Sequence, residues 1–483
     1  MSGIVAIKNN FNKADVEKML DKLHHRGPDD THLYQKGDYF IGEKVLASEF
    51  SSQDSNTEMN KIMAIDGEPL LHDTFITKDK LLDLYEKEGP EFVSYLGNGF
   101  SLILLENDRI FVARDTFGRK PLYYAIDDNG NFHFASEMKA LRDYFNNIEI
   151  FPPGSYYTEQ AGIQSFSSVP LFHSNIKDDP GSKDYYEKAA KLNYLMTKAV
   201  SEAWKEAKDP AVFLSGGVDS SVVAVALANL TDKKINTFAV GTENSEDILN
   251  ARKVSEYIQS HHVELTYNKD DMFEVLPEVI YYLESFDVEL VNSSIANFLV
   301  SKLAKEHGFD VVLSGEGADE LFGGYHHLKD CKTDTELNEA LEGLLRGLHN
   351  GGLQRVDRMT SAHSLNCRMP FLHHKIINFA KRIPCDWKIS RDGMEKLLLR
   401  QAFDGDLPSE VLWRKKAQFG IGSGNEKTME QVIDSEISDD EFNEDAQRYD
   451  LKFKSKEEYY YFKIFEKFFP GKGVIKNVNR WLV

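Results

Sequence analysis

The sequence contains little cysteine, with only Cys331, Cys367 and Cys385 among 483 residues. They are too few and too scattered for a disulfide framework, and their spacing does not match a metal-binding motif. We therefore expect a reduced, cytoplasmic protein. The chain also lacks long apolar runs, and its first residues do not place an apolar core behind a basic segment. Neither a membrane span nor a signal peptide is expected.

Basic residues are outnumbered, because 57 Lys and Arg stand against 78 Asp and Glu and give a net charge of −21. Binding to a phosphate backbone needs clustered Lys and Arg, so nucleic acid is not an expected partner. Apolar residues make up 41% of the chain, which is enough for sizeable cores. At this length two domains are expected, with a homodimer as the oligomeric state to test.

Two kinds of pattern divide the chain. Short strand-like runs, at residues 4–7, 39–41, 101–105, 110–114 and 132–134, predict a sheet-rich α+β domain over 1–160, with helices at 13–24 and 77–87. Residues 161–184 are polar and predict a linker. Apolar strands at 211–214, 236–241 and 309–313, each followed by a helical stretch, predict an α/β domain with a parallel sheet over 185–483.

A glycine-rich turn follows the first of these parallel strands: Ser215-Gly216-Gly217-Val218-Asp219-Ser220. Two glycines let backbone N–H groups approach a ligand, and the following helix N-terminus favours an anion such as phosphate. No Gly-Lys-Ser/Thr follows, so a Walker loop is disfavoured. The plain alternative is a well-capped strand-to-helix turn that binds nothing.

A second loop, Ser314-Gly315-Glu316-Gly317-Ala318-Asp319-Glu320, follows the strand at 309–313. Three carboxylates in one glycine-rich loop repel one another unless a cation is present, although a solvated acidic loop is the simpler reading. Carboxylate oxygens are ligands that Mg²⁺ prefers, and Asp219 and Asp319 are the pair we expect to hold it.

The first loop resembles the SGGxDS pyrophosphate loop of ATP pyrophosphatases, and the second resembles the SGEGxDExFGGY signature of asparagine synthetases. Phrases such as Arg26-Gly27-Pro28-Asp29-Asp30 extend the resemblance across the chain. It implies an N-terminal αββα sandwich of the N-terminal-nucleophile type and a PP-loop synthetase domain. It assigns ATP binding to Ser215, Gly216, Gly217, Asp219, Ser220, Val240, Ser314 and Gly315. It makes Glu316 a base for ammonia and Lys416 a cation that neutralises phosphate charge.

The N-terminal domain departs from this family at the positions that hydrolyse glutamine. Ser2 stands where the family has its nucleophilic cysteine, Val45 replaces the arginine that holds the glutamine carboxylate, and Asp66 replaces an asparagine. As a nucleophile, a serine hydroxyl depends wholly on a neighbouring general base, whereas a cysteine thiol is partly ionised at neutral pH. We therefore expect the N-terminal domain to be a scaffold that does not hydrolyse glutamine. The alternative is that Ser2, exposed by removal of Met1, is a serine nucleophile.

The synthetase domain departs from the family near the expected substrate, with Leu290 and Asn292 in place of Thr and Arg, Asn366 in place of Glu, and His373 in place of Asp. The predicted function is ATP-dependent adenylation of aspartate and amide formation, with ammonia favoured over glutamine. Two alternatives stay open: amidation or cyclisation of another carboxylate, and a regulatory protein without turnover.

Overall fold

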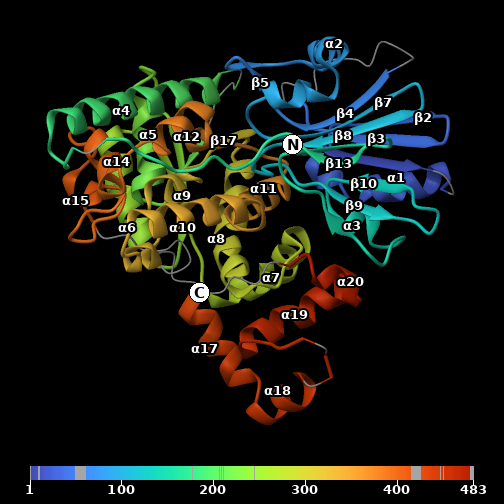
Figure 1. Ribbon diagram of the computed structural model, residues 1–483. Coiled ribbons are helices and arrows are strands. Elements are labelled where there is room, and N and C mark those ends of the chain that lie inside the picture. Colours follow the sequence, from blue (N-terminus) through green and yellow to red (C-terminus); the bar gives the residue numbers. More distant parts are fainter. Residues whose placement is uncertain are drawn as a thin grey trace.

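The computed structural model describes residues 2–8, 11–48, 61–176, 178–205, 207, 209, 211–243, 245–414, 426–446, 448–449 and 451–478. Two bodies lie side by side: a sheet-rich N-terminal domain, and a larger domain built around a parallel sheet (Figure 1). The C-terminal helices form a third layer beneath both. The boundaries at 160 and 185 stay a prediction.

Two antiparallel sheets form the N-terminal domain. One has the order β11-β9-β10-β1-β3-β2, with β1 (Gly3–Lys8), β2 (Asp30–Lys36), β3 (Tyr39–Val45), β9 (Tyr123–Ile126), β10 (Phe132–Ala135) and β11 (Glu149–Ile150). The other has the order β13-β12-β8-β7-β4, with β4 (Lys61–Gly67), β7 (Phe100–Glu106), β8 (Arg109–Arg114), β12 (Ser155–Thr158) and β13 (Gly162–Ser165). A separate hairpin pairs β5 (Leu70–Leu71) with β6 (Thr74–Phe75).

The strands alternate their apolar side chains between two cores. Ile4 and Ala6 of β1 face the second sheet, whereas Val5 and Ile7 face helix α1 (Lys13–Asp21). Helix α2 (Lys78–Glu88) covers the outer face of the second sheet. Because side chains of a strand point alternately to its two faces, this pattern buries each sheet on both sides. The predicted αββα sandwich is confirmed.

The larger domain contains a five-stranded parallel sheet in the order β16-β15-β14-β17-β18. Its strands are β14 (Ala211–Phe213), β15 (Asn236–Gly241), β16 (His261–Thr266), β17 (Val311–Leu313) and β18 (Asn366–Arg368). The chain moves outward from β14 to β16 and then returns to β17 on the other side of β14. This reversal opens a crevice beyond the carboxyl ends of β14 and β17, where open α/β sheets bind ligands.

Helices cover both faces of the parallel sheet (Figure 1). They are α4 (Lys183–Trp204), α5 (Val218–Ala228), α6 (Glu246–Ile258), α7 (Lys269–Leu283), α8 (Val288–Glu306), α9 (Ala318–Phe322), α10 (Asp334–Gly347), α11 (Gly352–Ser361), α12 (His374–Ala380), α13 (Cys385–Lys388), α14 (Leu397–Ala402) and α15 (Ser409–Leu412). The short helix α3 (Met138–Leu141) belongs to the N-terminal domain. Among all described residues, no helix combines the length and apolar character needed to cross a bilayer.

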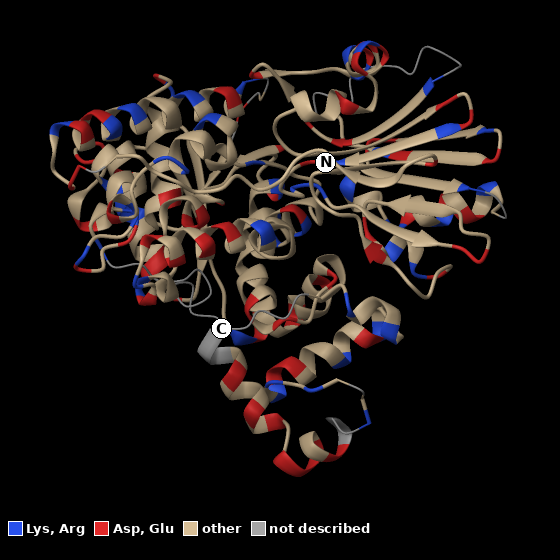
Figure 2. Ribbon diagram, in the orientation of Figure 1, with Lys and Arg blue, Asp and Glu red and all other residues tan. Residues whose placement is uncertain are grey.

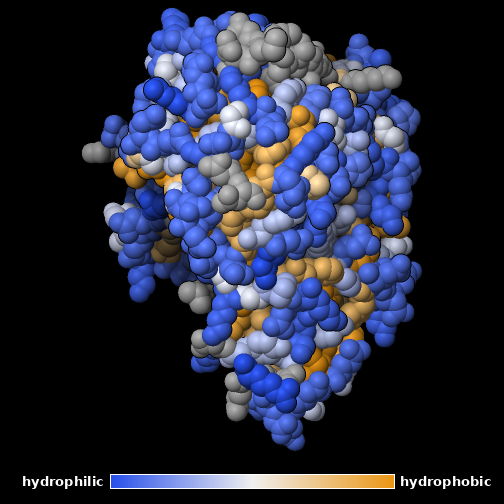
Figure 3. All heavy atoms as spheres, turned by 90° about the vertical axis from the view of Figure 1, so that its right-hand side faces the viewer, coloured by the Kyte–Doolittle hydropathy of each residue, from blue (hydrophilic) through white to orange (hydrophobic). Residues whose placement is uncertain are grey.

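The C-terminal layer consists of α17 (Glu426–Glu436), α18 (Asp439–Ala446), α19 (Lys456–Phe468) and α20 (Lys472–Ile475). Helix α19 packs on α7 and α8, and its Glu457 and Tyr461 hydrogen-bond to the buried side chain of Asn292 at 2.8 and 2.6 Å. Acidic side chains gather on α17 and α18 (Figure 2). The face formed by the N-terminal domain is mostly hydrophilic, with apolar residues in narrow bands (Figure 3).

Buried charges join the two domains. The fully buried Arg26 of the N-terminal domain lies 2.8 Å from each of three carboxylates: Asp66, Glu137 and Asp357. Asp357 belongs to α11 of the larger domain. Burial alone would raise the pKa of Asp357, but Arg26 and Lys120 outweigh it and lower that pKa to about 2. The pairing therefore keeps this carboxylate ionised inside the interface.

Candidate active site

The first glycine-rich loop connects β14 to α5 and bonds to itself. The hydroxyl of Ser220 accepts from the backbone N–H of Ser215 at 3.2 Å and lies 3.1 Å from the Ser215 hydroxyl. Gly216 has a φ of +68°, and a Cβ there would come within 2.4 Å of the Ala251 backbone nitrogen. Only glycine fits this position, so the loop can turn tightly against α6.

The second loop, which connects β17 to α9, packs directly on the first. A Cβ on Gly315 would lie 2.8 Å from the backbone carbon of Asp219 and 2.8 Å from the backbone nitrogen of Ser220. The amide of Ser314 donates to the Arg368 carbonyl at 3.1 Å and so ties the loop to β18. Both predicted loops therefore meet at the switch point of the sheet.

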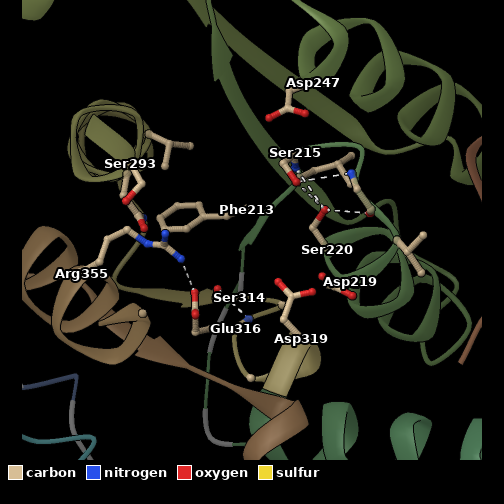
Figure 4. A pocket seen from close by; sticks show the side chains of 18 of the residues that line it. Phe213, Ser215, Asp219, Ser220, Asp247, Ser293, Ser314, Glu316, Asp319 and Arg355 are labelled. Carbon is tan, nitrogen blue, oxygen red and sulfur yellow. Dashed lines mark hydrogen bonds and ion pairs between the residues drawn. The ribbon is translucent and has the colours of Figure 1, made fainter. Parts of the chain in front are cut away.

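A buried lysine lies between the two aspartates that were predicted to hold a metal. Lys396 Nζ is 2.5 Å from Asp219 Oδ2 and 2.5 Å from Asp319 Oδ1, so these oxygens are at most about 5 Å apart. Burial disfavours the ammonium group, but the two carboxylates outweigh it and raise the pKa of Lys396. Asp219 and Asp319 lie beside each other (Figure 4) and share the Lys396 ammonium group. Their carboxylate oxygens are hard donors of the kind Mg²⁺ prefers.

The other acids of the second loop have separate partners. Glu316 forms an ion pair with Arg355 of α11 at 2.6 Å, and the two side chains point toward each other across the pocket (Figure 4). Glu320 accepts from the Tyr325 hydroxyl at 2.6 Å. Burial, followed by the charges of Glu316 and Asp319, raises the pKa of Glu320 to about 8. The expected repulsion among the three acids of this loop is thus relieved. Arg355 pairs with Glu316, Lys396 pairs with Asp319, and Glu320 is protonated.

These groups line a cavity of about 530 Å³. That volume lies within the roughly 300–1,000 Å³ typical of small-molecule sites. Seven of the eight predicted nucleotide-binding residues line the cavity: Ser215, Gly217, Asp219, Ser220, Val240, Ser314 and Gly315. Gly216 instead packs against α6. Leu290 and Asn292, where the chain departs from the resembled family, also line the cavity.

The structure adds residues that the sequence patterns did not single out. Lys396 is one, and Arg414 and Asp247 are two more, with Arg414 Nη2 3.8 Å from Asp247 Oδ1. Burial raises the pKa of Asp247 to about 7, although Arg414 opposes the shift. A lysine that follows Met394-Glu395, remote from both loops, carries no local signal of such a role. Lys416, the predicted phosphate-neutralising cation, lies outside the described residues.

Ser2 is 1% exposed and lies apart from the cavity, within the N-terminal domain. Its backbone nitrogen donates to Asp66 Oδ1 at 3.1 Å, and its carbonyl accepts from Arg26 Nε at 3.0 Å. Asp66 is itself paired with Arg26, and Val45 is buried. Ion pairs of the domain interface therefore surround the position where the resembled family has its nucleophile.

A PP-loop nucleotide-binding domain is the class that this arrangement defines. The asparagine synthase family matches residues 191–342 and 329–480, and the glutamine amidotransferase domain family matches residues 73–143. A glutamine-hydrolysing asparagine synthetase of Gallus gallus is 34% identical over 440 residues, which cover 83% of this chain and 78% of the relative. Another, from Arabidopsis thaliana, is 33% identical over 517 residues, which cover 97% of this chain and 88% of the relative.

A probable asparagine synthetase of Dictyostelium discoideum is 29% identical over 545 aligned positions, which cover 100% of this chain and 96% of the relative. The chain belongs to the asparagine synthase family, and it is an ATP-dependent ligase of that type. The family predicted from the two loops is confirmed.

Proposed function

We propose that this ligase joins ammonia to the side-chain carboxylate of aspartate, with AMP and pyrophosphate as the other products. One observation carries the proposal: aspartates from two loops share a cation at the switch point of the sheet, inside a cavity of nucleotide size. In this reaction a carboxylate oxygen attacks the α-phosphorus of ATP and pyrophosphate leaves. Ammonia then attacks the acyl carbon, and AMP leaves as the second product.

Each part of the cavity has a role in this reaction. Backbone N–H groups of the Ser215 to Gly217 turn and the hydroxyl of Ser220 would bind the pyrophosphate end of ATP, and Val240 would contact adenine. Asp219 and Asp319 would hold Mg²⁺, which supplies positive charge to the phosphates. Lys396 adds a second positive charge beside the departing pyrophosphate. Glu316 would accept the proton that the attacking ammonia loses.

Ammonia rather than glutamine is the nitrogen source that we propose. The N-terminal domain lacks the cysteine nucleophile, and Val45 cannot form the bidentate contact that an arginine offers a carboxylate. The Asp66 carboxylate beside Ser2 is already paired with Arg26. These contacts support a scaffold role for the domain. A cytoplasmic location and a homodimer complete the proposal.

Two assays test it. Exchange of radiolabelled pyrophosphate into ATP, with aspartate first and other acids after it, identifies the carboxylate; we expect exchange only with the true acid substrate. The variant Asp319→Asn should abolish exchange, while Glu306→Gln, on the exposed end of α8, should leave it unchanged. Exchange with another acid but not with aspartate would rule out aspartate as the substrate. Absence of ATP binding by calorimetry would favour a regulatory protein.

The nitrogen source is tested separately, by AMP formation with ammonium chloride and with glutamine at equal nitrogen concentration. We expect turnover with ammonia and almost none with glutamine. Equal rates would refute the ammonia preference and would favour Ser2 as a working nucleophile.

A further inference from the structure

Four side chains of metal-binding type converge where the N-terminal domain meets helices α4 and α12, away from the ATP cavity. Asp73 lies in the two-residue turn between β5 and β6. Glu202 is in the last turn of α4, His373 is the N-cap of α12, and His374 is the first residue of α12. Three separate segments of the chain therefore deliver these side chains to one place.

One ligand atom each of Asp73, His373 and His374 lies within 4.8 Å of the other two, and Glu202 joins this group through His373. His374 Nε2 is 3.3 Å from Asp73 Oδ1, and His373 Nε2 is 3.6 Å from the same oxygen. In a tetrahedral site with bonds of about 2.0–2.2 Å, neighbouring donor atoms are roughly 3.3–3.6 Å apart. His373 Nε2 and Glu202 Oε2 are closer, at 2.7 Å, and would separate slightly around an ion.

The donor atoms are buried and unsatisfied. The His373 side chain is only 8% exposed, yet its Nε2 makes no hydrogen bond, and neither do Glu202 Oε2 and Asp73 Oδ1. His373 and Glu202 approach each other without hydrogen-bond geometry, so neither satisfies the other. Buried polar atoms normally have partners, and such a group left without one calls for an unseen water or ion.

There is space for an ion beside the donors, and the carboxylates among them favour a cation, although Arg119 and Arg368 also line the adjoining cavity and oppose one. A cavity of about 30 Å³, lined in part by Glu202, His373 and His374, adjoins the donors and has room for an atom of water size. Two carboxylates carry two negative charges, and Lys375 on the other oxygen of Asp73 compensates one of them.

One existing contact opposes metal binding. His373 Nδ1 accepts from the backbone N–H of Lys375 at 3.3 Å, at the start of α12. Binding through Nε2 places the ring proton on Nδ1, so this weak cap would be lost. The gain for the three unsatisfied donor atoms outweighs one long hydrogen bond.

We propose that Asp73, Glu202, His373 and His374 form a Zn²⁺ site that fastens the β5–β6 hairpin of the N-terminal domain to α4 and α12 of the synthetase domain. Two imidazoles with two carboxylates suit Zn²⁺ better than Mg²⁺ or Ca²⁺, which prefer oxygen ligands alone. This site is independent of the proposed reaction, because none of its residues lines the 530 Å³ cavity.

The test uses the full chain, stripped with a chelator, dialysed and titrated with ZnCl₂ alone by calorimetry. Titration with Co²⁺ reports coordination through its visible absorption. The variants are Asp73→Asn, which keeps a residue tolerant of the left-handed φ of +64°, and His374→Ala, whose side chain is 47% exposed. His261→Ala, at an exposed position on β16, is the matched control.

We expect one Zn²⁺ per chain, intense tetrahedral Co²⁺ bands, and affinity at least tenfold weaker in Asp73→Asn and in His374→Ala but unchanged in His261→Ala. Zn²⁺ should also raise the thermal midpoint of the unmodified chain and not that of the two ligand variants. Absence of stoichiometric binding, or equal affinity in all four proteins, would overturn the site and leave His373 and Glu202 as an ordinary buried pair. If Asp73→Asn fails to fold, His374→Ala decides.

Discussion

Replacing Lys396 with methionine keeps a similar side-chain volume and removes the ammonium that Asp219 and Asp319 share. The two carboxylates, at most about 5 Å apart, then face each other without compensation. At an effective dielectric constant of about 20 their repulsion is about 3 kcal/mol. Both aspartates are about one-fifth exposed, which screens part of that repulsion. We expect Lys396→Met to lower the free energy of unfolding by about 2 kcal/mol without divalent ions.

The same variant should respond to Mg²⁺ more strongly than the unmodified protein. With the competing ammonium gone, the two carboxylates should bind Mg²⁺ more tightly, and an ion at 100 times its Kd stabilises the folded state by about 2.7 kcal/mol. Urea unfolding in EDTA and in 10 mM MgCl₂ measures both effects. Pyrophosphate release should fall by about 10²–10³-fold, because one positive charge beside the departing pyrophosphate is lost.

Lys305→Met is the matched control. Lys305 pairs with Asp310 at 2.7 Å on the surface, where an ion pair contributes about 0–1 kcal/mol. Equal unfolding free energies for Lys396→Met and Lys305→Met in EDTA, with unchanged pyrophosphate release, would refute the argument that Lys396 holds the acid pair together.

Three further predictions concern the loops, the pH dependence and the N-terminal domain. Gly315→Ala should lower ATP affinity at least tenfold by calorimetry, because its Cβ would push the two loops apart, whereas Gly343→Ala, with open space around it, should not; equal affinities would contradict the packing argument. Protonated Asp247 contributes stability that is complete below about pH 4 and is lost as pH rises through its raised pKa of about 7. Between pH 6 and pH 8 this loss is about 1.4 kcal/mol. Asp247→Asn should therefore make the urea midpoint depend less on pH over that range, and an unchanged dependence on pH would disprove the raised pKa of Asp247. Ser2→Cys should not produce glutamate from glutamine, since Val45 and the Arg26–Asp66 pair remain; measurable glutaminase activity would show that only the thiol was missing.

The sequence predicted the two loops well because their signals are local. Serines, glycines and acids that follow an apolar strand report a turn at a sheet edge, and that edge places Asp219 and Asp319 together. Strands β1, β3, β7, β8 and β10 were predicted for the same reason, since each has strong apolar runs. The edge strands β2 and β13 are half exposed and carry a weaker pattern.

Lys396 could not be predicted, because its role depends on the tertiary fold. The segment around it reads as the start of a helix, but α14 begins one residue later, and Lys396 is its N-cap with a φ of +57°. That backbone turn directs the ammonium toward two loops that are more than 70 residues distant in sequence. The same limit applies to the Asp73, Glu202 and His373 cluster, which three remote segments assemble.

Because Arg26 pairs with a buried acid of the other domain, removal of the N-terminal domain should destabilise the protein, even if that domain has no chemistry of its own. A shortened chain that began at the synthetase domain would leave Asp357 without Arg26 and Lys120, the two cations that most lower its pKa. Glu284, which accepts from the backbone N–H groups of Met138 and Lys139, would lose those donors as well. The larger domain therefore depends on the N-terminal domain for the partners of its buried charges, whatever chemistry that domain performs.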